Sequence, residues 1–267
     1  MTPALLPRHF VEKPWGRTDL PAEFGEHQER VGEVWYDRAD EPLPVLVKWI
    51  FTSEKLSVQV HPDDTQAHKL GLASGKEECW IVTHAEPGAT LGIGLKQSLT
   101  ASQLREASLS GAVEHLMDWR PVSAGDWFYI PAGTVHAIGA GVTLVEIQQN
   151  ADVTFRLYDY GRPRTLNLTE GVAVAMPRPY RGAHGRWSSE GFPDRPVVGP
   201  NFRISFLTDK DLAASRTPND PLLLVPIRGR IWCGQRAATT GDVIISNSLV
   251  DISREDHSVC LLVELHV

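Results

Sequence analysis

The chain has 267 residues, enough for one large β domain or two small ones, and its 42% hydrophobic and 22% charged residues are typical of a soluble globular protein. Its formal net charge of −7 argues against a nucleic-acid partner, whose phosphates call for a basic face. A phosphorylated small molecule is not excluded, because it needs only a few local cations.

Nothing in the sequence predicts a membrane protein or a secreted one. No segment carries 18 or more uninterrupted apolar residues, which excludes a transmembrane helix. The N-terminus lacks the charged start and long apolar run of a secretion signal. Cys79, Cys233 and Cys260 are widely spaced and odd in number, so we expect no disulfide framework and no Cys-x-x-Cys site. A reducing cytoplasm fits this pattern best.

Two strands are expected after a stretch of turns and aromatic residues over 1–40. The first covers 43–51 and carries one charge, Lys48, which fits either a side chain that snorkels at a strand edge or a residue of a binding cavity. The second alternates, so that Gln59 and His61 point the same way before Pro62 ends the strand. A β-barrel places metal ligands in its mouth in this way, but a polar strand face with a surface histidine gives the same pattern.

The next elements are a short helix or loop over 63–75, capped by Asp64 or Thr65, and a strand over 75–82. In this strand Glu78 shares one face with Trp80 and Val82, while the residues between them take the other face. A further short strand is expected at 91–95.

Over 99–119 apolar residues recur at helical spacing. This predicts one or two helices inserted between strands, with Thr100 or Ser102 as the N-cap and a break at Gly111.

Four more strands are expected between 126 and 158. A Gly-Asp turn leads into an aromatic strand and a Pro-Ala-Gly turn leads out of it, so that His136 opens the following strand. The strands at 142–149 and 153–158 alternate, with Glu146 on one face of the former and Arg156 on one face of the latter.

Residues 161–200 are rich in Pro, Gly and Arg, which makes them the best linker candidate, with one short helix at 169–176. Beyond them, short apolar runs separated by turns predict a second β-sandwich. Its Gly-Asp-Val-Ile-Ile at 241–245 resembles Gly-Asp-Trp-Phe-Tyr at 125–129, which indicates a weak internal repeat. No histidine follows the second copy at the matching distance, so a metal site is not expected there.

Four candidate metal donors therefore stand at strand ends: Gln59, His61, Glu78 and His136. Zn²⁺ accepts imidazole nitrogen and carboxylate oxygen, and a catalytic site keeps one position open. The residues alone fit a metal site in one barrel and scattered polar residues equally well, and they name no reaction.

Four segments in the correct order resemble the signatures of type I mannose-6-phosphate isomerases (phosphomannose isomerases), which are zinc-dependent enzymes of the cupin superfamily. They are Leu-Ser-Val-Gln-Val-His-Pro-Asp-Asp at 56–64, Gly-Lys-Glu-Glu-Cys-Trp-Ile-Val at 75–82, Tyr-Ile-Pro-Ala-Gly-Thr-Val-His-Ala-Ile-Gly at 129–139 and Thr-Phe-Arg-Leu-Tyr-Asp-Tyr at 154–160. The resemblance runs from about residue 15 to about residue 160, while the C-terminal third matches only loosely.

This resemblance implies a mainly β protein: a cupin, or jelly-roll, β-sandwich barrel with a small helical insertion and a second, degenerate C-terminal jelly roll. Residues 1–165 would form the metal-binding cupin domain with its insertion at about 99–119, residues 166–200 a linker, and residues 201–267 the degenerate domain.

The resemblance also implies one Zn²⁺ per chain, bound by the four donors named above, and a zinc-dependent aldose–ketose isomerase that interconverts mannose 6-phosphate and fructose 6-phosphate through an enediol. Lys76 and Arg156 would act near the substrate and Glu146 would face the cavity. Lys48 matches a lysine of the family and would bind substrate. Arg162 and Arg164 are candidate phosphate anchors, although solvated loop cations are the alternative.

Some assignments stay open. A lysine beside the metal, its pKa lowered by the cation and by burial, suits a proton shuttle, but Lys76, Glu146 and a metal-bound water are all candidates for the base. Glu77 replaces the family's usual threonine and should point away on strand parity, and Asn167 replaces a common histidine.

Three other functions compete: an isomerase of a related or unphosphorylated sugar, a non-catalytic sugar-binding cupin, and an Fe²⁺ cupin dioxygenase, whose usual His-x-His is missing here. The expected partner is a small-molecule sugar phosphate, without nucleic acid or membrane, and the sequence makes no prediction of the oligomeric state.

Overall fold

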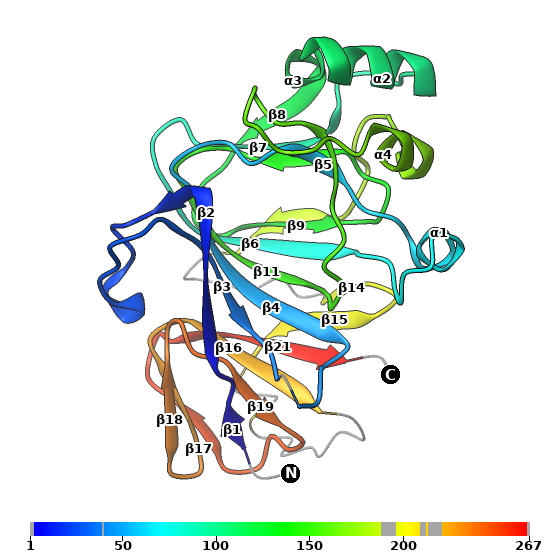
Figure 1. The fold of residues 1–267 in the computed structure, drawn as a ribbon. Helices are drawn as coiled ribbons and strands as arrows, with labels where there is room; N and C mark the ends of the chain where they lie inside the picture. Colours follow the sequence, from blue (N-terminus) through cyan, green and yellow to red (C-terminus); the bar gives the residue numbers. More distant parts are fainter. Residues whose placement is uncertain (1–2, 39, 188–195, 209–211, 213–220, 266–267) are drawn as a thin grey trace.

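The computed structural model describes residues 3–38, 40–187, 196–208, 212 and 221–265, and it is mainly antiparallel β structure in two stacked units (Figure 1). The first unit contains a seven-stranded and a five-stranded sheet that face each other, and the second contains a six-stranded and a three-stranded sheet. This confirms the predicted fold class, a jelly-roll barrel followed by a second β unit. No helix of the described chain is both long and apolar enough to span a membrane.

The first unit contains a seven-stranded sheet, ordered β13-β9-β6-β11-β4-β3-β2, and a five-stranded sheet, ordered β12-β5-β10-β7-β8. Their inner faces share one apolar cluster, which closes the barrel at one end. The seven strands are β2 (Arg8–Arg17), β3 (Val31–Tyr36), β4 (Val45–Phe51), β6 (Glu78–Ala85), β9 (Asp126–Ile130), β11 (Val142–Gln149) and β13 (His184–Arg186). The five are β5 (Val58–Val60), β7 (Thr90–Leu95), β8 (Met117–Pro121), β10 (His136–Ile138) and β12 (Phe155–Tyr158).

The helices are short, and most of them pack outside the five-stranded sheet. They are η1 (Ala22–Phe24), α1 (Asp64–Lys69), α2 (Ala101–Ser110), α3 (Val113–Leu116) and α4 (Leu168–Val174). Thr100 caps α2 as predicted, and Gly111 ends it in a left-handed conformation with φ 78°. The cap of α1 is Asp63, not Asp64 or Thr65, because its carboxylate accepts from the backbone N–H of Gln66 in a capping box.

The second unit has a six-stranded sheet, ordered β1-β19-β16-β21-β15-β14, and a three-stranded sheet, ordered β18-β17-β20, with an apolar cluster between them. The strands are β1 (Ala4–Leu5), β14 (Val197–Val198), β15 (Phe202–Phe206), β16 (Leu222–Arg228), β17 (Arg230–Cys233), β18 (Arg236–Thr239), β19 (Ile244–Ser246), β20 (Ile252–Arg254) and β21 (Val259–Leu265).

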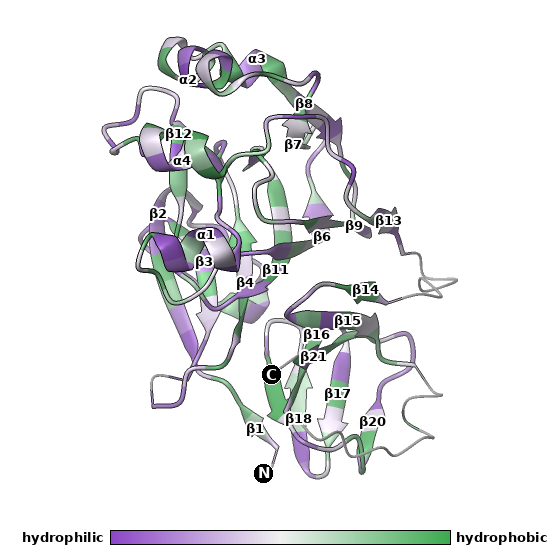
Figure 2. Ribbon diagram, turned by 90° about the vertical axis from the view of Figure 1, so that its right-hand side faces the viewer, coloured by the Kyte–Doolittle hydropathy of each residue, from purple (hydrophilic) through white to green (hydrophobic). Residues whose placement is uncertain are grey.

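The six-stranded sheet packs on the outer face of the seven-stranded sheet, and one large apolar cluster joins them. Figure 2 shows the two units stacked, with β14 and β15 lying nearest to β6 and β9. On β4, for example, Val45, Val47 and Trp49 face the second unit, while Lys48 and Ile50 face the barrel interior. The second unit therefore buttresses the back of the barrel rather than closing its mouth.

The weak internal repeat corresponds to a shared turn. Before β9, the carboxylate of Asp126 accepts from the N–H of Ser123 at 2.8 Å and binds Arg186 at 2.6 Å. Before β19, the carboxylate of Asp242 accepts from the N–H of Thr239 at 2.9 Å and binds Arg8 at 2.7 Å. The glycine before each aspartate has a positive φ, 97° and 86° respectively, which explains the Gly-Asp pair in both copies.

Three expectations need correction. Residues 1–40 are not mainly turns, because they contain β2 and β3, whose pairing is interrupted by register shifts. The helical insertion ends at Leu116 and not at 119, since Met117 begins β8. The described part of the expected linker is folded: α4 packs on β12, β13 joins the seven-stranded sheet and β14 joins the six-stranded one.

The apolar cluster between the six-stranded and the seven-stranded sheet predicts that the two units stabilise each other. Leu261 lies in it with 0% exposure, so Leu261→Ala should lower the free energy of unfolding by about 2–5 kcal/mol through lost burial and a residual cavity. Leu109→Ala is the control, because this side chain is 63% exposed on α2 and its loss should change stability by less than about 0.5 kcal/mol. Denaturant unfolding measures both, and equal losses would contradict the shared core.

Candidate active site

One glutamine and two histidines lie close together because they belong to neighbouring strands of the five-stranded sheet. Gln59 on β5 lies opposite His136 on β10 and opposite Arg156 on β12. His61 follows directly after β5, where Pro62 ends the strand. The strand pairing therefore places Gln59, His136 and Arg156 side by side on three neighbouring strands, with His61 two residues beyond Gln59 on the same face.

The opposing seven-stranded sheet supplies the charged residues. Glu146 on β11 lies between Lys48 on β4 and Trp80 on β6, and the indole N–H of Trp80 donates to Glu146 at 2.9 Å. Glu78 lies at the start of β6, one inward-facing position before Trp80. The predicted strand parity is correct, since Glu78 and Trp80 face the interior.

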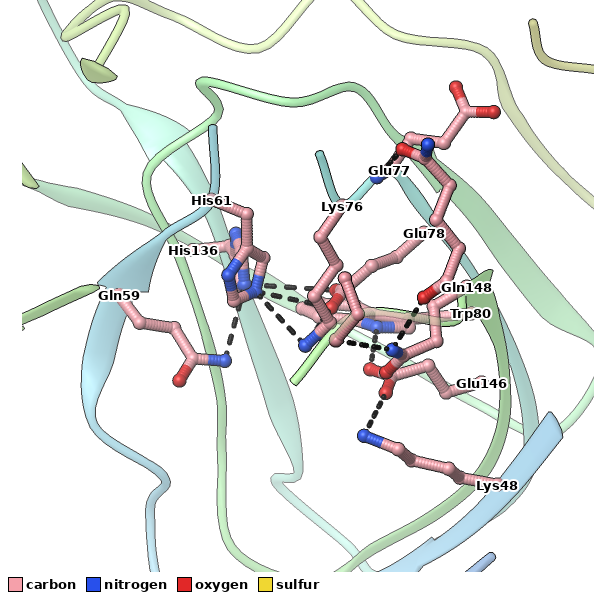
Figure 3. A network of polar contacts seen from close by, with 12 residues as sticks. Lys48, Gln59, His61, Lys76, Glu77, Glu78, Trp80, His136, Glu146 and Gln148 are labelled. Carbon is pink, nitrogen blue, oxygen red and sulfur yellow. Dashed lines mark hydrogen bonds and ion pairs between the residues drawn. The ribbon is translucent and has the colours of Figure 1, made fainter. Parts of the chain in front are cut away.

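His61, Glu78 and His136 converge, with ligand atoms that all lie within 4.8 Å of one another (Figure 3). His61 Nε2 is 3.1 Å from Glu78 Oε1, and His136 Nε2 is 3.7 Å from Glu78 Oε2. Gln59 lies at the edge of this group, with its amide nitrogen 3.3 Å from His136 Nε2. The three-residue group comes from three strand regions far apart in the sequence.

The chemistry of this group fits a metal ion such as zinc. The Nδ1–H of His136 donates to the carbonyl of Thr134 at 2.8 Å, which leaves Nε2 unprotonated and aimed at Glu78. Oε2 of Glu78 is buried without a hydrogen-bond donor, and a buried acceptor of this kind suits a metal cation, while Oε1 is the oxygen that the Lys76 ammonium approaches. Rotation of the Gln59 amide by 180° would present its oxygen to the same place. Two imidazole nitrogens and a carboxylate are a common zinc donor set.

Lys76 is the ionised partner of Glu78. Its ammonium is 2.9 Å from Glu78 Oε1 and 3.4 Å from His61 Nε2. Burial opposes both charges, but the attraction between them raises the pKa of Lys76 and holds that of Glu78 well below its usual range. The lowering of a lysine pKa that is expected beside a bound cation stays a prediction, because the raised pKa of Lys76 refers to the polypeptide alone.

Lys48 and Glu146 form a second pair, with Lys48 Nζ 3.5 Å from Glu146 Oε1, and their pKa values are shifted in the opposite directions to those of Lys76 and Glu78. Burial and the nearby charge of Lys76 lower the pKa of Lys48, while burial and the charge of Glu78 raise the pKa of Glu146. Lys48 is 5% exposed, lies over the ring of Trp35 and lines the cavity described below, so the snorkelling interpretation is wrong, while its role in binding substrate stays a prediction.

A cavity of about 300 Å³ opens above these residues. Gln59, Lys76 and Glu146 line it, while His61, Glu78 and His136 lie deeper, each at most 1% exposed. Among the described residues, five cations and three acids line this cavity: Lys13, Lys48, Lys76, Arg156, Arg164, Glu33, Glu146 and Asp152. The balance is locally positive in a chain of net charge −7, as binding of an anionic ligand requires.

The three arginines differ in position. Arg156 lines the cavity, and its Nε is buried without a hydrogen-bond acceptor. Arg164 also lines the cavity but is bound in a bidentate pair by Asp159. Arg162 is not among the lining residues, because its guanidinium donates to the carbonyl of Lys55 and pairs with Asp159. The expectation that Arg162 contacts substrate stays a prediction.

Comparison with known proteins identifies the family. No protein-family model matches the chain. A mannose-6-phosphate isomerase from Streptococcus mutans is 33% identical over 234 residues, which are 83% of this chain and 72% of that relative. The chain belongs to the mannose-6-phosphate isomerase family. A second relative, a mannose-6-phosphate isomerase from Bacillus subtilis, is 38% identical over 162 residues, which are 57% of this chain and 50% of that protein.

Solved structures of mannose-6-phosphate isomerases share the whole fold. The crystal structure of the Bacillus subtilis enzyme superposes with a TM-score of 0.83 at 24% identity, over 99% of this chain and 100% of that one. A putative mannosephosphate isomerase from Archaeoglobus fulgidus reaches 0.75 at 19% identity, over 99% and 98%. The second β unit is therefore part of the shared architecture.

Sequence reasoning missed the residues of the cavity mouth that come from β2 and β3. Glu33 pairs with Lys13 at 3.5 Å and with Lys48 at 4.0 Å, and it accepts the indole N–H of Trp35 at 2.5 Å. Burial opposes its charge, but the two lysines hold the pKa of Glu33 below its usual range. The alternation of Glu33 and Trp35 against Val34 and Tyr36 was the available signal.

Burial of His61 predicts that the stability of this chain depends on pH after treatment with a chelator. Burial, followed by the positive charge of Lys76, lowers the pKa of His61 from 6.5 to about 3. Between pH 6.5 and about 3, His61 is protonated in the unfolded chain but neutral in the folded chain. The contribution of His61 to the free energy of unfolding is therefore complete above pH 6.5 and is lost as the pH falls toward about 3. His61→Gln should flatten this loss in denaturant unfolding, whereas replacement of the exposed His9 by Gln should leave the slope unchanged. Equal slopes in all three proteins would contradict the burial of a neutral His61.

Proposed function

We propose that this chain interconverts mannose 6-phosphate and fructose 6-phosphate through an enediol, with one zinc ion per chain. The observation that carries the proposal is the convergence of His61, Glu78 and His136 beneath a cation-rich cavity, in a member of this family. A cytoplasmic site of action is part of the proposal, and three buried, free cysteines are compatible with a reducing compartment.

His61, Glu78 and His136 would hold the zinc, with Gln59 as a fourth ligand through its amide oxygen. Zinc bound there would supply Lewis-acid polarisation of the sugar's carbonyl and hydroxyl oxygens. The Nδ1 bond of His136 to Thr134 fixes the ring orientation that this role needs.

The reaction moves a proton between C1 and C2 of the open-chain sugar, so the chain must take up and return one proton. Glu146 suits this task because its raised pKa brings the carboxyl closer to neutral pH, where general acid–base groups work best. Lys48, 3.5 Å away and with a lowered pKa, can exchange a proton with it. We assign Lys76 a different role from proton transfer: its ammonium would neutralise Glu78 and face the sugar oxygens from the cavity floor.

Arg156 would stabilise negative charge on the sugar oxygens. Burial lowers its pKa, yet a guanidinium remains cationic at neutral pH, and its unpaired Nε is free to donate. For the phosphate, the lining cations Arg164 and Lys13 replace Arg162 as the better candidates, since both reach the cavity.

His136→Ala should abolish both zinc retention and isomerase activity, because it removes a ligand that no other described residue replaces. Metal analysis after dialysis, combined with a coupled isomerase assay, measures both. Removal of the metal from the unaltered protein by a chelator should likewise abolish activity, and added zinc should restore it. Full activity of the metal-free variant would disprove the proposal.

Arg156→Ala should lower kcat by about 10²–10³-fold, in the range of a lost oxyanion donor, while zinc stays bound. The same assay on free mannose separates an isomerase of phosphorylated sugars from one of unphosphorylated sugars: a rate far below that on mannose 6-phosphate is expected. Unchanged turnover of the variant would remove Arg156 from the reaction, and equal rates on both sugars would remove the phosphate from the proposal.

A further inference from the structure

Glu77 lies between Lys76 and Glu78, just before β6 begins, and its side chain points to the other side of the chain. Figure 3 shows it directed away from the two histidines. It is only 3% exposed, although it lies outside the barrel interior. A carboxylate buried at this point, next to two residues of the site, needs a physical explanation.

The carboxylate of Glu77 bridges the two β units. Its Oε1 accepts from the backbone N–H of Asn201 at 2.9 Å and from the Asn201 side-chain amide at 3.1 Å. Its Oε2 accepts from the hydroxyl of Tyr129 on β9. Asn201 lies in the turn between β14 and β15, so these bonds join the metal-site segment to the six-stranded sheet.

The absence of a side chain at Gly199 allows the turn between β14 and β15 to lie close to the Glu77 carboxylate. A Cβ at this position would lie 2.9 Å from Glu77 Oε1 and 3.0 Å from the ring of Tyr129. Any larger residue would therefore push the turn of the second unit away from the carboxylate.

The backbone of Glu77 is fixed as well. Its N–H donates to Gln149 Oε1 at 3.0 Å, and its carbonyl accepts from the N–H of Gln149 at 3.1 Å. The amide of Gln149 in turn donates to Asp64 at 2.9 Å, and the N–H of Gly75 donates to the same oxygen of Asp64 at 2.8 Å. The segment 75–77 is thus held from the α1 side and from the second unit at once.

We propose that Glu77 is a positioning residue, which couples the second β unit to the active site by fixing the rotation of segment 76–78, which carries Lys76 and leads into β6 at Glu78. Successive side chains on a strand point to opposite faces. A carboxylate clamped on the outer face therefore sets the direction of its two neighbours on the inner face. This inference rests on the metal site of the proposed function, and it gives the second unit a task beyond stability.

The test compares Glu77→Ala with Glu77→Gln, which keeps the shape and the acceptor for Asn201. Zinc affinity is measured by competition with a chelator, together with kcat, KM and denaturant unfolding. Glu77→Ala should weaken zinc binding by about 10–100-fold, the usual effect of losing a group that orients a metal ligand. It should also lower kcat more than it raises KM. Glu77→Gln should restore both close to the values of the unaltered chain.

Two further variants separate positioning from stability. Gly199→Ala should reproduce the loss of zinc affinity from the other side of the contact. Arg8→Gln is the matched control, because the Arg8–Asp242 pair also joins the two units but lies at a different turn. It should lower stability without changing zinc affinity.

Unchanged zinc affinity and kcat in Glu77→Ala, with only a loss of stability like that of Arg8→Gln, would overturn the positioning role. Failure of the unaltered chain to bind zinc would instead overturn the proposed function. The two failures are therefore distinguishable.

Discussion

The central constraint of this structure is that the seven-stranded sheet is covered on both faces, by the barrel interior on one side and by the second unit on the other. A sheet of this kind normally consists of continuous apolar strands. Here Lys48, Glu146 and Glu78 interrupt three such strands on the inner face, where each charge would be costly without a partner. Their mutual pairing, and the open donor set around Glu78, follow from that burial.

The two lysine–carboxylate pairs of the interior have different chemical tendencies. Lys76 and Glu78 stabilise each other's charges, whereas Lys48 and Glu146 are both shifted toward their neutral forms. The difference arises because Lys76 and Glu78 act on the second pair as well as on each other. The two carboxyl groups, Glu78 and Glu146, therefore have pKa values that are pushed apart, one lowered and one raised, and this is the usual sign of divided acid–base roles. This supports Glu146 rather than Lys76 as the proton carrier.

The sequence predicts those parts of the site that depend on strand alternation. Gln59, Glu78 and Glu146 lie in uninterrupted strands, so their direction follows from period two alone. Glu33 was missed because register shifts in β2 obscure the strand pair to which it belongs. Strand alternation gives no prediction for Arg162, because it lies in a turn, where its contacts to Asp159 and Lys55 set the direction of its side chain. The family resemblance supplied the ligand set, which spacing alone left open.

The second unit shows what the fold is like without the polar interior. It repeats the Gly-Asp turn, with the same aspartate cap and arginine partner, yet the buried polar side chains among its described residues are only Ser246 and Ser258. Its strands β16 and β21 are apolar on both faces, one packed inside the unit and one against the barrel. Burial of the charged pairs costs the first unit desolvation free energy, and the apolar contact with the second unit offsets this cost. The repeat has therefore diverged into a unit that holds the chemistry and a unit that supports it from behind.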